Sequence, residues 1–150
     1  IGRTDGLEAG VEKNSNWKII AQQTGEFTQA KGQEVMESVL KQYDNIDVVY
    51  CENDNEAFGA IDAIEAAGLT YGVNGDITVI SFDATHAGLT DTLAGKINFN
   101  GECNPLHGPR VEKIIQQLEK GETPDKLAYV DEETFDATTI TQAIVDARAY

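Results

Sequence analysis

Short apolar runs rich in Val, Ile and Tyr alternate along the chain with segments of helical periodicity. The apolar runs predict strands over residues 18–22, 46–51, 77–82 and 97–100, and a more exposed strand over residues 126–132. These runs are continuously apolar rather than alternating, which is typical of parallel strands that helices cover on both faces.

Helical patterns fill the intervals between the apolar runs. Apolar side chains at three- and four-residue spacing predict helices over residues 28–43, 55–67, 85–93 and 138–148, and residues 2–13 indicate the end of a first helix. Pro105 opens one further helix. Its apolar stripe, which we expect to be buried, consists of Val111, Ile114, Ile115 and Leu118.

Strands and helices in this order predict an α/β fold with right-handed crossovers and a doubly wound parallel sheet. Ligands of such sheets bind outside the carboxyl ends of the strands. The segments that leave the expected strands there are residues 24–27, 52–55, 83–86 and 102–105, and Arg3 stands at the start of the first helix.

One edge of the sheet is therefore expected to gather an aromatic ring, an arginine, an amide and several carboxylates. This chemistry suits a sugar, because carboxylates accept from hydroxyl pairs and an aromatic face covers apolar C–H groups. Simpler interpretations stay open: Asn55 and Thr85 suit helix N-caps, Phe27 suits a small core, and Glu26 suits a solvated position.

The sequence also predicts the caps of one helix and the state of the two cysteines. Asp54 or Asn55 is expected to cap the start of the helix over residues 55–67, and Gly68 its end in a left-handed conformation. Cys51 and Cys103 lack metal-binding or redox spacing, so we expect two buried free thiols.

The composition argues against several classes of partner. The chain has 26 carboxylates against 11 Lys and Arg and a formal net charge of −15, which disfavours nucleic acid and anionic membrane surfaces. No apolar run reaches the roughly 18 residues that predict a membrane span. The chain opens on Ile1 without an initiator Met, so we expect it to be a segment of a longer protein.

Catalytic motifs are not apparent in the sequence. There is no Gly-x-Ser-x-Gly elbow and no phosphate-binding glycine loop after a strand. Asp83 and His86 are better interpreted as a helix cap and a surface imidazole than as a catalytic pair, and His107 has no metal-ligand partner nearby. We therefore expect a binding protein rather than an enzyme, with no cofactor and no metal.

Three junctions resemble patterns of the ribose-type periplasmic binding proteins. Residues 52–60 (ENDNEAFGA) resemble the Asn-Asp helix start of that family. Residues 77–83 (ITVISFD) resemble its V-x-G-F-D strand, with Ser81 where glycine is usual, and residues 25–32 (GEFTQAKG) resemble its acidic-F-x-x-x-K-G turn. The resemblance covers almost the whole chain as the family's C-terminal portion and is closest to the branch that binds galactofuranose, ribose and related sugars.

The resemblance implies ligand contacts from five residues, which are Arg3, Phe27, Asn53, Asp83 and Glu102. It also implies three regions: residues 1–103 as most of the C-terminal lobe, residues 104–125 as a helix that belongs to the other lobe, and residues 126–150 as a returning hinge strand and terminal helix.

The strand order of that family's lobe implies a gap in the sheet. The order is 2-1-3-4-5, and the first, central strand is missing from the sequence, so residues 18–22 and 46–51 are expected to lie one strand apart. Unpaired buried backbone is costly. We therefore expect the missing N-terminal lobe or a second chain to complete the sheet.

The function that the resemblance implies is that of an extracytoplasmic solute-binding component of an ABC importer. Such a protein, in the periplasm or as a cell-surface lipoprotein, closes on a monosaccharide between two lobes and delivers it to a permease. The alternative is the effector-binding core of a LacI-type repressor, which shares the fold. Upstream sequence distinguishes the two, because a signal peptide indicates transport and a basic helix-turn-helix indicates repression.

Overall fold

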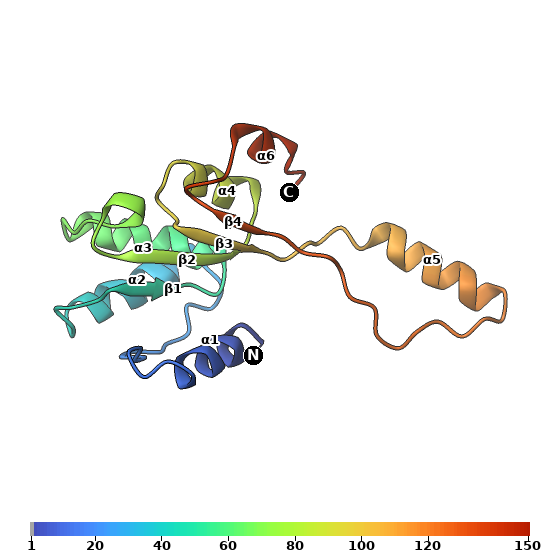
Figure 1. Ribbon diagram of the computed structural model, residues 1–150, viewed down its shortest axis with the longest axis horizontal. Coiled ribbons are helices and arrows are strands. Elements are labelled where there is room, and N and C mark those ends of the chain that lie inside the picture. The colour runs from blue at the N-terminus through green and yellow to red at the C-terminus, as the bar shows by residue number, and fades with distance from the viewer. Residues whose placement is uncertain (1) are drawn as a thin grey trace.

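A computed structural model describes residues 2–150 and shows helices and strands in alternation (Figure 1). The helices are α1 (Gly2–Glu12), α2 (Gln29–Leu40), α3 (Asp54–Ala66), α4 (His86–Leu93), α5 (Gly108–Glu119) and α6 (Gln142–Ala147), with a short 3-10 turn η1 (Gly72–Asn74). The strands are β1 (Val48–Tyr50), β2 (Thr78–Asp83), β3 (Phe99–Glu102) and β4 (Thr134–Asp136).

The four strands form one sheet in the order β1-β2-β3-β4. β1, β2 and β3 are parallel, as the sequence predicts, whereas β4 runs antiparallel to β3. The strand expected over residues 126–132 is not formed, and β4 begins two residues later. Residues 126–132 have no neighbouring strand to pair with, and an extended segment counts as a strand only through such pairing.

Helices lie against both faces of the sheet, as expected for a doubly wound fold. Neighbouring residues of a strand point to opposite faces. On β2, the hydroxyl of Ser81 donates to Asp54 of α3, while the ring of the next residue, Phe82, lies under the guanidinium of Arg3 in α1. α3 and the start of α1 therefore lie on opposite faces.

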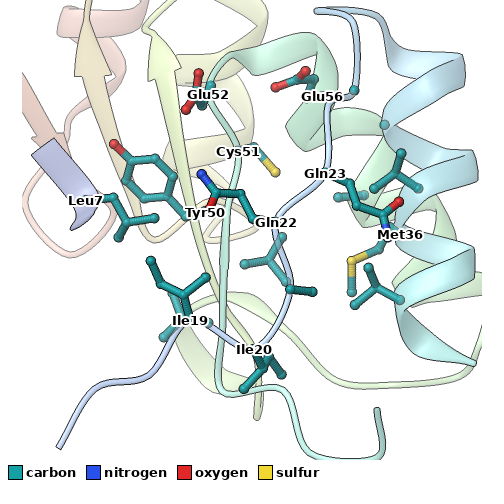
Figure 2. A pocket seen from close by; sticks show the side chains of 18 of the residues that line it. Leu7, Ile19, Ile20, Gln22, Gln23, Met36, Tyr50, Cys51, Glu52 and Glu56 are labelled. Atoms are coloured by element: carbon teal, nitrogen blue, oxygen red, sulfur yellow. The ribbon is translucent and has the colours of Figure 1, made fainter. Parts of the chain in front are cut away.

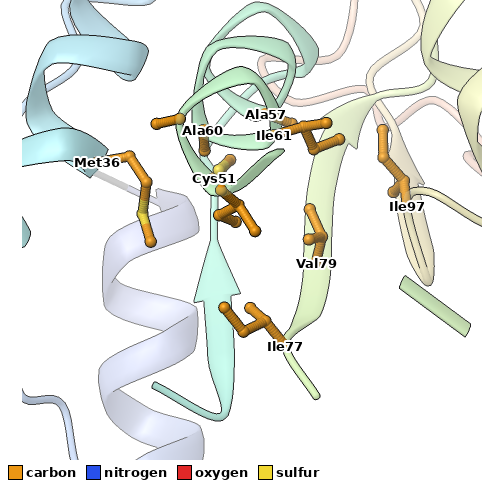
Figure 3. Close-up of a cluster of buried hydrophobic side chains, with 10 residues drawn as sticks. Met36, Cys51, Ala57, Ala60, Ile61, Ile77, Val79 and Ile97 are labelled. Atoms are coloured by element: carbon orange, nitrogen blue, oxygen red, sulfur yellow. The ribbon is translucent and has the colours of Figure 1, made fainter. Parts of the chain in front are cut away.

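The main core lies between the sheet and α3. Figure 3 shows Ala57 and Ile61 of α3 against Val79 and Ile97, with Met36 of α2 at one side. A second cluster surrounds α4 and α6 and contains Ala84, Leu89, Phe135, Ile140 and Val145. The left-handed cap expected at Gly68 is confirmed by its φ of 72°.

Residues 18–22 do not form a strand, which corrects the expectation, yet they lie where the missing-strand prediction places them. They line a hollow of about 550 Å³ that separates them from β1. We call this hollow, lined by residues 17–25, β1, α1 and α2, the open slot. Figure 2 shows Ile19 and Ile20 on one side and Tyr50 on the other.

The backbone explains why residues 18–22 are not a strand. Among residues 2–150, no backbone–backbone hydrogen bond involves residues 18–24, and β1 pairs with β2 alone. A strand in the open slot would pair with both edges. The gap expected from the resemblance is therefore present in the structure.

α5 extends away from the sheet on two connecting segments (Figure 1). Its apolar stripe was expected to be buried, but none of its residues is, and Val111, Ile115 and Leu118 are at least half exposed. The thiols also differ from expectation, because Cys51 is buried whereas Cys103, on the first connection, is exposed. Among residues 2–150, no helix combines the length and apolarity needed to cross a membrane.

The open slot predicts that replacing Val by Ala lowers the free energy of unfolding more on β2 than on β1. Val49 and Val79 are register partners; Val49 lines the slot and is partly exposed, while Val79 is fully buried. Val79→Ala should lower the free energy of unfolding by about 2 kcal/mol, and Val49→Ala by less than about 1 kcal/mol. Urea unfolding measures both, and equal costs would mean that the slot is filled in solution.

Candidate functional site

Two of the expected site residues, Arg3 and Asp83, form an ion pair at the carboxyl edge of the sheet. Arg3 lies in the first turn of α1 and Asp83 ends β2, and their Nη2 and Oδ1 atoms are 2.6 Å apart. The guanidinium also donates to the carbonyl of Glu52 and lies 5.3 Å from the centroid of the Phe82 ring. Both partners of the pair stay partly accessible to solvent.

The Asp83 carboxylate accepts a side-chain hydrogen bond from Arg3 and stays one-third exposed. Burial raises the pKa of Asp83 above its ordinary value, and the neighbouring Arg3 offsets this only in part. Burial alone would lower the pKa of Arg3, yet the hydrogen bond that its guanidinium donates to Asp83 helps to raise this pKa overall. Because the Asp83 carboxylate is partly exposed, it can accept further hydrogen bonds from the hydroxyl groups of a ligand.

Backbone strain concentrates at the same edge. Among residues 2–150, the non-glycine residues with positive φ are Glu26 (53°), Phe27 (56°), Asp83 (99°) and Ala84 (52°). They form two turns, one ahead of α2 and one after β2. Such conformations cost about 1–3 kcal/mol each and cluster at ligand-binding positions, which supports a functional role for this edge.

Phe27 and Asn53 lie together, but their exposure differs. The ring of Phe27 is 58% exposed at the edge, while Asn53 is buried. Asn53 accepts from the amide of Glu56 at 2.8 Å and donates to the carbonyl of Phe27 at 3.3 Å. Asn53 is therefore the N-cap of α3, which corrects the expectation that Asp54 or Asn55 has this position.

A buried network under the edge was missed from the sequence. Asp54 is 2% exposed and accepts from Ser81 Oγ, Thr85 Oγ1 and Asn100 Nδ2, each at 2.7 Å, and from the Thr85 amide at 2.8 Å. Asn100 in turn accepts from the amide of Ala84 at 3.1 Å. The network holds the strained turn after β2, and polar residues within apolar strands were the signal for it.

Glu102 lies on the same edge, where it is the register partner of Asp83, but its carboxylate faces the chain. Its side chain is 6% exposed and accepts from Arg148 Nη1, from the Tyr150 hydroxyl at 2.6 Å and from the Glu133 amide at 2.8 Å. The structure thus joins Arg3 with Asp83 and Phe27 with Asn53, while Glu102 belongs to a separate cluster.

Comparison with known proteins relates the chain to one family. Residues 1–101 match the model of the periplasmic binding protein domain. A galactofuranose-binding protein of Escherichia coli is 37% identical over 131 residues, which are 85% of this chain and 41% of that protein. A fructose import binding protein of Bifidobacterium longum is 28% identical and matches 94% of this chain and 43% of its own length.

Solved structures give the same result. A Mycobacterium smegmatis protein in complex with β-D-fucofuranose is 42% identical, with a TM-score of 0.83 over 95% of this chain and 44% of that one. The binding component of an arabinose ABC transporter from Shewanella, bound to L-arabinofuranose, is 33% identical, with a TM-score of 0.89 over 97% and 48%. The chain spans less than half the length of these relatives.

The Glu102 carboxylate predicts a stability that depends on pH. Burial would raise its pKa, but the Tyr150 hydroxyl, Arg148 and the Glu133 amide together lower it below the usual 4.5. Ionised Glu102 therefore stabilises the folded state above pH 4.5, and this contribution is lost as the pH falls through the lowered pKa.

Urea unfolding of the wild type and Glu102→Gln measures this effect. The difference between their midpoints should be largest at neutral pH and should close below pH 4.5. Glu133→Gln makes the same chemical change at an exposed neighbour and should show no such closure. A constant difference for Glu102→Gln would contradict the prediction.

Proposed function

Because this chain belongs to the periplasmic binding protein family, we propose that it forms most of one lobe of an extracytoplasmic sugar-binding protein of an ABC importer. The Arg3–Asp83 pair, at the same edge of the sheet as the exposed Phe27, is the observation that carries this proposal. A cation, a partly exposed carboxylate and an aromatic face are the groups that recognise a sugar's oxygens, hydroxyls and C–H patch.

The ligand that we propose is a monosaccharide, bound without chemical change. The names of the relatives, which bind galactofuranose, fucofuranose and arabinofuranose, favour a sugar in its furanose form. The same names favour transport over a repressor core. We propose no cofactor and no catalytic step.

Three regions of the chain have different places in this proposal. Residues 1–103 contribute most of one lobe, residues 104–125 a helix that packs on the other lobe, and residues 126–150 the return through the hinge. The exposed apolar stripe of α5 supports this arrangement, because a helix with one apolar face is stable when that face is covered.

The open slot has the properties of the place for a central strand. Helices cover both of its faces, and both of its edges offer unpaired backbone. Arg3, at the start of α1, donates to the carbonyl of Glu52 just beyond β1, so α1 begins at the carboxyl edge. A parallel strand in the slot would end at that edge. We propose that an extended segment ahead of α1 occupies it, as in a right-handed β-α-β unit.

Transport follows from binding that shifts a hinge equilibrium. A sugar that contacts both lobes stabilises the closed form by its differential contacts, and the permease recognises that form. One lobe alone holds part of those contacts. This chain should therefore bind sugar far more weakly than the two-lobed protein does.

A sugar screen tests the proposed function. The natural two-lobed protein should rise in melting temperature with at least one of D-galactose, D-fucose, L-arabinose, D-ribose and D-fructose. Asp83→Ala should abolish that rise, because it removes the carboxylate that accepts from the sugar's hydroxyls.

Asp91→Ala is the matched control. Asp91 is a partly buried carboxyl whose pKa burial also raises, but it lies in α4 near Lys96 rather than with Arg3. This variant should show the same rise in melting temperature with the sugar as the wild type, whatever its own melting temperature is. An equal response of wild type and Asp83→Ala would refute the proposed site.

The apolar stripe of α5 predicts a substitution whose cost depends on the other lobe. Ile115→Asp should change the free energy of unfolding of this chain by less than about 0.5 kcal/mol, because Ile115 is half exposed. In the two-lobed protein it should cost at least about 2 kcal/mol, because a carboxylate would be buried against apolar surface.

Urea unfolding of both proteins measures the two costs. Gln116→Asp places the same charge on the next residue, which is exposed and outside the apolar stripe, and should be tolerated in both. Similar small costs for Ile115→Asp in both proteins would contradict the proposed packing of α5.

A further inference from the structure

Arg148 is enclosed by aromatic rings and a carboxylate near the end of the described chain. Its guanidinium carbon lies 5.0 Å from the ring centroid of Phe135 and 4.9 Å from that of Tyr150. Its Nη1 atom pairs with Glu102 at 2.5 Å, and the two side chains are 9% and 6% exposed. We call Glu102, Phe135, Arg148 and Tyr150 the arginine clamp.

The arginine clamp lies where both connections to α5 leave the sheet. There the Glu102 amide donates to the Glu133 carbonyl at 2.9 Å, and the Glu133 amide donates to the Glu102 carboxylate at 2.8 Å. One step further out, the Asn104 amide donates to Glu132 at 3.0 Å. Beyond these contacts the two connections run out to α5 (Figure 1).

The clamp also reaches α4. The backbone carbonyl of Tyr150 accepts from the amide of His86, the first residue of α4, at 2.5 Å. Residues 148–150 therefore tie three elements together: the end of β3, the approach to β4 and the start of α4.

We propose that Arg148 and Tyr150 are positioning residues for the hinge, which act on the two connections through Glu102. This inference rests on the proposed two-lobed function. Charge-assisted hydrogen bonds in a site with little solvent are stronger than neutral ones, and the two rings add cation–π attraction. The clamp fixes the base of both connections, so bending takes place further out.

This assignment gives Glu102 a role different from direct sugar contact. Its carboxylate already accepts three hydrogen bonds from Arg148, Tyr150 and Glu133 and has little exposed surface. Its effect on ligand affinity is then indirect: a loose hinge has more conformational freedom to lose when the lobes close on a ligand.

Amide hydrogen exchange of the ligand-free chain tests the clamp. Tyr150→Phe removes one hydroxyl and keeps the ring beneath Arg148. The amides of Glu102, Asn104 and Glu133 should exchange about fivefold faster in this variant, which is the change that one lost hydrogen bond produces. Arg148→Met should accelerate them further, and Arg148→Lys, which keeps the charge, should restore part of the protection.

Tyr43→Phe is the control, since it makes the same change three residues after the end of α2, far along the chain from the connections. It should leave the three amides unaffected. Unchanged exchange in Tyr150→Phe and Arg148→Met would overturn the proposal. So would equal acceleration of the core amides of α3, because that pattern reports a general loss of stability rather than a loosened hinge.

A second measurement separates this inference from the proposed function. The exchange experiment contains no sugar, so its result stands whether or not the protein binds one. In the two-lobed protein, calorimetry with L-arabinose should show several-fold weaker binding for Tyr150→Phe than for Tyr43→Phe. Equal affinities for L-arabinose in these two variants would overturn the link between the clamp and closure.

Discussion

The buried carboxylate of Asp54 makes the interactions on which the proposed ligand-binding edge depends. It lies at the start of α3 and accepts hydrogen bonds from β2, from β3 and from the turn before α4. A buried carboxylate is costly unless donors surround it, so the donors must stay in place for the fold to be stable. One side chain thereby fixes the relative positions of four elements, and Asp83 lies within the turn that it holds.

Local pattern predicted most of this architecture correctly. The expected strands over residues 46–51, 77–82 and 97–100 correspond to β1, β2 and β3, and the expected helices over residues 28–43 and 55–67 correspond to α2 and α3. Periodicity reports which side chains face apolar surroundings, and for these elements the covering surface is part of the chain.

The wrong expectations share a physical cause. Residues 18–22 and 126–132 have strand-like composition but no neighbouring strand among residues 2–150, and the stripe of α5 has no surface to cover it. Strand formation and burial both require a partner, and sequence periodicity cannot show whether that partner is present. Where composition and structure disagree in this chain, the partner that the pattern implies is therefore absent from residues 2–150.

The sequence could predict that two site residues lie together only where the strand and helix order alone brings them to one place. Arg3 and Asp83 meet because α1 begins, and β2 ends, at one edge of a parallel sheet. The roles of Asp54 and Arg148 depend on contacts between residues 27 to 46 positions apart, which no local pattern encodes. For Asp54 there was a signal, because Ser81 and Asn100 are polar residues within apolar strands. For Arg148 no local pattern indicated its role.

The turns at this edge are held rigidly, whereas the connections that lead to α5 are held by few hydrogen bonds. The strained turns at Phe27 and Asp83 are held by hydrogen bonds from within the lobe, so a ligand does not have to order them on binding. The connections beyond Glu102 and Glu133 have few such bonds beyond the one at Asn104. In the proposed two-lobed protein, the conformational entropy lost on closure would therefore come mainly from the connections. The affinity of the intact protein should then depend on two separable quantities, the fit of a preorganised half-site and the stiffness of the hinge beside it.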